Sequence, residues 1–296
     1  MESRKPDQDP GKFKMPDYKK LITKELIEKI QGVEIFQTSM YSELVIAETL
    51  AFFTKRYVQQ LFDFTEVTKD TVIVDAGAGF GWLSMAFAYS TDAKIIAIDS
   101  DENRVVAGRE IVKLMGIGEQ IEWRAGSLGS LPLEDRVADV VYCIEVLEHV
   151  YKDHNAILDL HRTSKDLVII TTPNLWFPVI AHDTQLPFCH WLPVPIRKPY
   201  AKLFNRTIFQ NDNLFWSPVT LRKHMKGFKP VSKWLHYKSL DRFKETFPFY
   251  LPYNSGRYVK KLGTAKKLYY ELAAKLGMAS HYVLPSLAYV FKRVEK

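Results

Sequence analysis

A glycine-rich turn that follows a carboxylate is the part of the sequence that indicates chemistry most clearly. Asp75 ends a short β-branched run, and glycines then stand at alternate positions, Gly77, Gly79 and Gly81. Glycine lets the backbone approach a ligand closely, and ligands of open α/β sheets lie beyond the carboxyl ends of the strands. A dinucleotide fingerprint would need a glycine where Trp82 stands. Because Asp75 would repel a pyrophosphate, the turn favours a ligand with an ammonium or sulfonium group; the alternative is a tight turn without a ligand.

A second carboxylate, Asp99, ends the next apolar run along the chain. A carboxylate at this position can accept two hydrogen bonds from a ribose diol. The alternative is that Asp99 caps the N-terminus of the following helix. Ser100 or Asp101 could fill that capping role instead, which favours the ribose role for Asp99.

Apolar runs that alternate with helical stretches must position these residues. Strands are predicted at 71–75, 94–99, 120–124, 139–144 and 166–171, with helices at 82–89, 102–115 and 155–163. Such alternation indicates a parallel sheet, and the apolar strands indicate that both of its faces are covered. Outside this region we expect helices at 18–30, 39–62 and 217–227, the last with Ser217 as N-cap and Pro218 at its first position. Two more strands are expected at 229–237 and 286–294.

On these motifs the sequence resembles the class I S-adenosylmethionine-dependent methyltransferases. It is most similar to their small-molecule branch, which includes ubiquinone-type and glycan-modifying O-methyltransferases. The resemblance covers about residues 70 to 175 and rests on the motifs at 75–81, 98–99, 125–133, 144–150 and 171–174. It implies an α/β, Rossmann-like fold with a seven-stranded, mostly parallel sheet, an antiparallel last strand, an N-terminal helical cap and lid insertions. It also implies S-adenosylmethionine as cofactor and S-adenosylhomocysteine as product.

The resemblance assigns roles to the residues at the strand ends. Gly77 and Gly79 would lie behind the methionine part of the cofactor, and Asp99 would hold the ribose. Ser127 and Leu128 would flank the adenine, although the family usually has Asp where Ser127 stands. The full set of expected cofactor contacts is Asp75, Gly77, Gly79, Gly81, Asp99, Ser100, Ser127, Leu128 and Ile144.

Three polar residues, Glu145, Glu148 and His149, follow the fourth predicted strand. In ubiquinone-type relatives the equivalent positions are associated with a divalent metal, and an oxygen-rich set of this kind suits Mg²⁺. Our expectation is a site without a metal, in which Glu145 and His149 belong to the catalytic set and His149 is the general base. A third reading is that the Glu–His pair only shapes the pocket.

The aromatic, proline-rich segment after the fifth strand is expected to overhang the active site. It contains His182, a second candidate for the catalytic base, and His190 next to Trp191. Both histidines could instead anchor a lid through hydrogen bonds. We predict His190, Trp191 and Tyr41 as substrate contacts.

The composition bounds the remaining possibilities. The chain has 296 residues, and 41 Lys and Arg against 34 Asp and Glu give a net charge of +7. Two cysteines, Cys143 and Cys189, are too few for a disulfide framework, and the polar N-terminus lacks a secretory signal, so a cytoplasmic location is expected. The predicted segments are a mobile tail (1–17), a helical cap (18–68), the cofactor-binding core (69–172), an aromatic lid (173–216) and a C-terminal part of the core (217–296) with a basic insert (240–282).

The function that these features indicate is methyl transfer to oxygen on a small or amphipathic acceptor, such as a glycan, a lipid-linked sugar or a phenol. The positive charge leaves open an RNA methyltransferase and peripheral contact of the basic insert with an anionic membrane. Nucleic acid is disfavoured because Ile144-Glu145-Val146 stands where nucleic-acid amino-methyltransferases have an Asn/Asp-Pro-Pro-Tyr/Phe motif. A non-catalytic partner protein with the same fold is a further alternative, but its hallmark would be a damaged cofactor loop.

Overall fold

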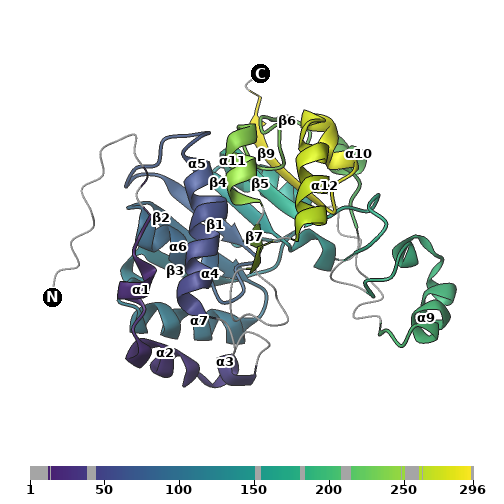
Figure 1. The fold of residues 1–296 in the computed structure, drawn as a ribbon. Helices are drawn as coiled ribbons and strands as arrows, with labels where there is room; N and C mark the ends of the chain where they lie inside the picture. Colours follow the sequence, from purple (N-terminus) through teal and green to yellow (C-terminus); the bar gives the residue numbers. More distant parts are fainter. Residues whose placement is uncertain are drawn as a thin grey trace. The chain divides into compact units, whose positions relative to one another are not determined.

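The computed structural model describes residues 13, 15–38, 45–150, 155–180, 184–207, 215–247, 249–250, 260–261 and 263–294. The chain divides into two compact units, residues 1–125 with 246–262 and residues 126–245 with 263–296 (Figure 1). Two of the expected site residues, Tyr41 and His182, lie outside the described residues. The segment boundaries predicted from the sequence stay predictions.

In the part of the first unit that the structure describes, three parallel strands lie in the order β3-β2-β1. They are β1 (Val72–Ala76), β2 (Lys94–Asp99) and β3 (Ile121–Ala125). The helices are α1 (Tyr18–Leu21), α2 (Lys24–Gln31), α3 (Glu34–Thr38), α4 (Ile46–Phe53), η1 (Thr54–Val58), α5 (Gln59–Leu61), α6 (Trp82–Ser90), α7 (Glu102–Leu114) and η2 (Gly118–Gln120). A short antiparallel pair, β7 (Phe249–Tyr250) and β8 (Lys260–Lys261), completes the unit.

The single helix expected over 18–30 is wrong, because the structure breaks it into α1 and α2. Thr23 adopts an extended backbone and its side chain accepts a hydrogen bond from the N–H of Leu26, so it caps a new helix. Further along, the helix expected over 39–62 is described from Ile46 onward. There α4, the π-helical turn η1 and α5 follow one another without a break.

The described residues of the second unit form four strands in the order β4-β5-β9-β6. They are β4 (Ala138–Ile144), β5 (Ser164–Pro173), β6 (Phe228–Pro230) and β9 (Ser286–Arg293). β4 and β5 are parallel, and β9 is antiparallel to both β5 and β6, as expected for the last strand. The helices are η3 (Leu147–His149), α8 (Asn155–Thr163), η4 (Cys189–Trp191), α9 (Val194–Leu203), α10 (Pro218–His224), α11 (Leu240–Thr246), α12 (Thr264–Ala274) and η5 (Gly277–Tyr282). The expected fold class, α/β with seven mostly parallel strands, is confirmed.

Two local expectations in the second unit have different outcomes. Ser217 and Pro218 begin α10 as predicted, and a capping box joins Ser217 to Thr220. The strand expected at 229–237 is wrong beyond Pro230, because the hydroxyl of Ser232 accepts the N–H of Val290 and so replaces a backbone partner. Both cysteines are buried thiols that form no disulfide, as expected of small apolar residues.

A buried hydrogen bond joins the end of β1 to α6 and so sets the two ends of the glycine loop. Asp75 is the last polar residue of β1, and its Oδ2 accepts the hydroxyl of Ser84 at 2.7 Å. Burial raises the pKa of Asp75 to about 6, while the hydrogen bonds from Ser84 lower it and the charge of Asp99 raises it further. Because burial disfavours the charged form, Asp75 destabilises the fold once it ionises.

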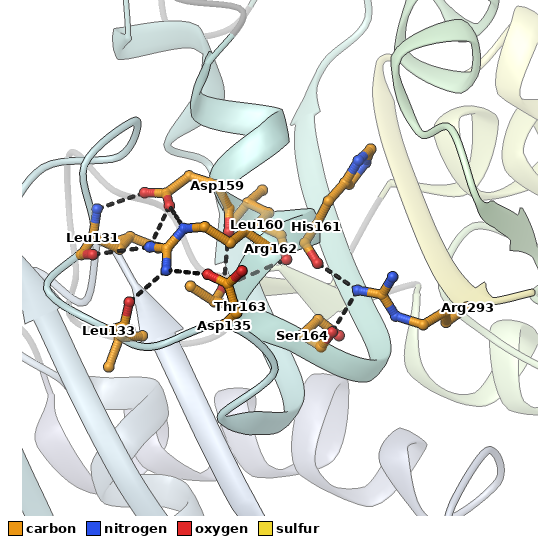
Figure 2. A network of polar contacts seen from close by, with 10 residues as sticks. All are labelled: Leu131, Leu133, Asp135, Asp159, Leu160, His161, Arg162, Thr163, Ser164 and Arg293. Carbon is orange, nitrogen blue, oxygen red and sulfur yellow. Dashed lines mark hydrogen bonds and ion pairs between the residues drawn. The ribbon is translucent and has the colours of Figure 1, made fainter. Parts of the chain in front are cut away.

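A guanidinium-centred network fastens the loop before β4 to α8 in the second unit (Figure 2). Arg162 Nε and Nη2 donate to Asp159 Oδ1 at 2.9 and 2.6 Å, and Nη1 donates to Asp135 Oδ1 at 2.9 Å. The same guanidinium donates to the carbonyl groups of Leu133 and Leu131 at 2.5 and 3.1 Å. The buried Asp159 also accepts the N–H of Leu131 at 2.5 Å. The network therefore fixes residues 131–135, which follow the segment with Ser127 and Leu128.

The pKa of Asp75 predicts a pH-dependent stability difference between the wild type and Asp75→Asn. The folded pKa is raised above its usual value, so wild-type stability is fully present below about pH 4 and is lost as pH rises through about 6. The loss amounts to about 3 kcal/mol, and Asn cannot ionise. Urea unfolding of both proteins from pH 3 to 7 measures the difference, which should grow with pH in favour of Asp75→Asn. Parallel stability curves would contradict the prediction.

Removal of the Arg162 guanidinium should weaken the second unit. Arg162→Met leaves the buried Asp159 without its cation and two carbonyl groups without donors, so we expect a loss of about 2–4 kcal/mol of unfolding free energy. Arg124→Met is the matched control, because Arg124 pairs with the exposed Glu122 and such surface pairs contribute about 0–1 kcal/mol. Equal losses in the two variants, measured by denaturant unfolding, would show that the network does not stabilise the fold.

Candidate cofactor-binding site

The glycine loop between β1 and α6 adopts a backbone that favours glycine throughout. Gly77, Gly79 and Gly81 have φ values of +85°, +58° and +79°, a region that other residues rarely adopt. A Cβ at Gly81 would lie 2.4 Å from the ring of Trp123, whereas one at Gly79 would meet open space. The loop is therefore tightly packed at its helix end and open around Gly79, where a ligand can approach the backbone.

The carbonyl oxygen of Ile98, near the end of β2, holds the beginning of this loop. It accepts the N–H groups of Gly77 and Ala78, both at 2.8 Å. The loop then closes when Gly81 N donates to the carbonyl of Ala78 at 2.8 Å. Two neighbouring strands thus fix the loop.

The carboxylate of Asp99 is buried and joins the glycine loop to α7. Its Oδ2 accepts the N–H of Gly79 at 2.7 Å, and its Oδ1 accepts the N–H of Asp101 at 2.9 Å. The Asp101 side chain caps α7 by accepting the N–H of Asn103, so the capping role falls to Asp101. Each carboxylate oxygen can accept a second hydrogen bond, which suits a ribose diol. Ser100, between the two aspartates, is exposed.

The first unit therefore fits the half of S-adenosylmethionine that its motifs indicate. A buried carboxylate with acceptor capacity on both oxygens matches a diol, and an open, left-handed glycine backbone allows close approach of the methionine part. Asp75, which the sequence suggests for a cationic group, instead accepts from Ser84 through one of its oxygens.

The remaining expected cofactor residues belong to the second unit. Ser127 is exposed and its backbone carbonyl accepts the N–H of Ser130, whereas Leu128 is buried. Ile144 is half-buried at the end of β4. The adenine role of Ser127 and Leu128 stays a prediction.

Glu145 comes directly after β4 in a strained backbone conformation. Its φ is +55° although it is not glycine, and its N–H donates to the carbonyl of Thr171 on β5 at 2.9 Å. Residues kept in such sparsely populated regions cluster at functional sites. The strain therefore supports a functional role for the turn between β4 and η3.

The neighbouring Glu148 and His149 differ in exposure. Glu148 is fully buried, and its Oε2 accepts the hydroxyl of Thr172 at 3.0 Å. His149 is 45% exposed, with Nε2 3.9 Å from Glu148 Oε1. Within the described part of the chain, no group of three His, Cys, Asp or Glu residues is placed to hold a metal ion. The second unit thus presents an accessible imidazole beside a buried carboxylate, and Glu145, Glu148 and His149 do not form a metal cluster.

His190 and Trp191 both bind the carbonyl oxygen of Leu175. The distances are 3.0 Å from His190 Nε2 and 2.6 Å from Trp191 Nε1. His190 is buried, and burial lowers its pKa. Nε2 donates the bond, because a carbonyl oxygen can only accept. This contact agrees with the alternative in which the histidine anchors the segment. Trp191 is half exposed and keeps a surface that a substrate could contact.

Asn174 is a residue whose role sequence reasoning missed, although its motif was noted. It is fully buried directly after β5, and its Nδ2 donates to the carbonyl groups of His281 and Leu284 at 2.9 and 2.8 Å. Its Oδ1 accepts the N–H of Trp176 at 3.0 Å. Asn174 therefore ties the start of the aromatic segment to the residues before β9; the only signal in the sequence is an Asn that follows an apolar strand.

Comparison with known proteins shows similarity to methyltransferases. Residues 73–166 match the model of a methyltransferase domain. A sterol 24-C-methyltransferase of Eremothecium gossypii is 21% identical over 125 residues, 42% of this chain and 34% of that protein. A caffeoyl-CoA O-methyltransferase of Zinnia elegans is 28% identical over 102 residues, 34% of this chain and 41% of that protein. The chain thus spans less than half the length of either relative.

Among solved structures, the YcgJ protein from Bacillus subtilis has a TM-score of 0.48 at 14% identity. The match covers 84% of this chain and 99% of that protein. The resemblance inferred from the strand-end motifs is confirmed by the sequence comparisons, in which residues 73–166 match a methyltransferase domain and the relatives are named methyltransferases.

Proposed function

We propose that the protein is an S-adenosylmethionine-dependent methyltransferase that methylates oxygen on a small or amphipathic acceptor, such as a glycan, a lipid-linked sugar or a phenol. One observation carries the proposal: the buried Asp99 carboxylate holds Gly79 of an open, left-handed glycine loop and retains acceptor capacity for a diol. The intact loop also argues against a non-catalytic partner protein.

The residues of the first unit would hold the cofactor. Asp99 would accept the ribose hydroxyls, and the backbone around Gly77 and Gly79 would lie behind the methionine part. When bound, S-adenosylmethionine supplies a methyl group that is already activated by its sulfonium. The protein therefore has to position the acceptor and remove one proton.

His149 is the candidate for the proton acceptor. Its imidazole is exposed, and η3 holds it next to the strained turn at Glu145. By their names, the relatives methylate carbon, oxygen and, in a glycine/sarcosine/dimethylglycine N-methyltransferase of Actinopolyspora halophila, nitrogen. We favour oxygen here because a histidine, and not a Pro-Pro-Tyr motif, follows β4.

The ribose role of Asp99 predicts a specific loss of affinity. We expect S-adenosylmethionine and S-adenosylhomocysteine to bind in the micromolar range, and Asp99→Ala to weaken both by about 1–3 kcal/mol, because the hydroxyls lose a charged acceptor. Titration calorimetry measures this. Asp101→Ala is the matched control: it removes the α7 cap, costs about 1 kcal/mol of stability and should leave affinity nearly unchanged. Unchanged affinity in Asp99→Ala, or tighter binding of NAD than of S-adenosylmethionine, would contradict the proposal.

The acceptor class can be tested with labelled cofactor. The protein is incubated with methyl-labelled S-adenosylmethionine and cell extract, and the lipid, water-soluble and nucleic-acid fractions are then separated. We expect the label in the lipid or small-molecule fraction, either as a base-stable methyl group or as a methyl ester.

In the same assay His149→Ala should reduce incorporation by about 10²–10⁴-fold while calorimetry shows intact cofactor binding. Label in RNA alone would favour the nucleic-acid alternative. Activity that EDTA abolishes and Mg²⁺ restores would replace the simple histidine base with metal assistance.

A further inference from the structure

The aromatic segment of the second unit contains a helix whose apolar stripe faces solvent. Ile196, Tyr200, Leu203 and Phe204 stand at i, i+4, i+7 and i+8, the spacing of one helix face. Ile196, Leu203 and Phe204 are 51%, 76% and 52% exposed. Ala201 is the only buried residue of α9. In Figure 1 α9 lies away from the strands of its unit.

Hydrogen bonds to backbone carbonyl groups tie this helix to the residues that precede it. Arg197 Nε and Nη2 donate to the carbonyl groups of Leu192 and His190, each at 2.8 Å. The Tyr200 hydroxyl donates to the carbonyl of Pro187 at 3.1 Å. Residues 190 and 191 are bound in turn to the carbonyl of Leu175. The helix is thus anchored through Arg197 and Tyr200, while the other stripe residues, Ile196, Leu203 and Phe204, stay exposed.

Two further aromatic side chains continue the apolar surface at the anchored end. Phe188 and Trp191 are each 49% exposed, and their ring centroids lie 5.0 Å apart. The Tyr200 hydroxyl binds the carbonyl of Pro187, the residue that precedes Phe188 in the chain, and so brings the stripe close to Phe188. Exposed apolar surface of this extent is a mark of an interaction site, and tryptophan is enriched where a protein meets the membrane–water interface.

The charge of the segment selects the partner. Residues 184–207 contain no Asp or Glu, and they contain Arg197, Lys198, Lys202 and Arg206. Lys198 and Lys202 stand one turn apart, on a different face from the stripe. An apolar face combined with a lysine-bearing polar face is the pattern of helices that lie in the interface plane of an anionic bilayer.

We propose that residues 188–206, here called the α9 surface, dock on an anionic lipid bilayer. The stripe enters the headgroup boundary and the cations contact anionic headgroups. Docking does not require a spanning element, and none of the helices in the described ranges is long and apolar enough to cross a membrane. The proposal goes beyond the methyltransferase function and stands independently of it, and it differs from the basic insert at 240–282 that the sequence suggested.

The experiment measures sedimentation of the full chain with vesicles of phosphatidylcholine alone or with about a third phosphatidylserine, at low and high salt. The wild type should sediment with the anionic vesicles at low salt. Leu203→Glu/Phe204→Glu and Lys198→Glu/Lys202→Glu should each weaken the partition coefficient at least about 10-fold. All four side chains are exposed, so circular dichroism should show unchanged folding.

Two controls separate the α9 surface from its rivals. Val106→Glu changes an apolar residue that is 60% exposed on α7 and should bind vesicles like the wild type. Lys266→Glu/Lys267→Glu alters α12 of the basic insert and should do the same. Wild-type binding by both α9 variants, or loss of binding only in the α12 variant, would overturn the proposal. A third result would also overturn the proposal: the wild type forms a dimer and does not bind vesicles, and Leu203→Glu/Phe204→Glu dissociates that dimer. A second copy of the chain would then cover the stripe.

Discussion

The buried carboxylate of Asp99 is the interaction on which the rest of the candidate site depends. It accepts two backbone N–H groups, from Gly79 in the glycine loop and from Asp101 at the start of α7. Hydrogen bonds to a charged acceptor are stronger than neutral ones, and the helix N-terminus stabilises negative charge. A ligand hydroxyl bound by Asp99 therefore meets an acceptor already fixed in position, so little ordering is needed when the ligand binds.

The sequence allowed prediction of those features that local chemistry decides. The alternate glycines at 77–81 need left-handed backbone, which only glycine adopts freely, and the structure has all three there. Five apolar runs predicted the parallel strands, and Asp101 could be recognised as a cap that leaves Asp99 available. Ser217 with Pro218 likewise marked the start of α10. In each case the signal lies within a few residues of the feature.

Features that depend on distant partners could not be read in this way. Arg162 binds Asp135, and Asn174 binds the carbonyls of His281 and Leu284, across stretches of sequence that no periodicity connects. His190 illustrates the consequence for function: a histidine among aromatics resembles a substrate ligand, but its Nε2 is bound to the Leu175 carbonyl. The role of His190 depends on a backbone acceptor. Because every residue has such an acceptor, the sequence does not indicate which one His190 binds.

The α9 helix is a second case in which the sequence pattern does not decide what a surface contacts. A stripe at i, i+4, i+7 and i+8 reveals which residues share a face, but not whether that face points to a core. In a core helix the stripe provides most of the stability, because short helices are marginal alone. Here Arg197 and Tyr200 bind backbone carbonyls and supply an anchor instead. Ile196, Leu203 and Phe204 are thereby left exposed for another surface, and the surrounding cations restrict which surface that can be.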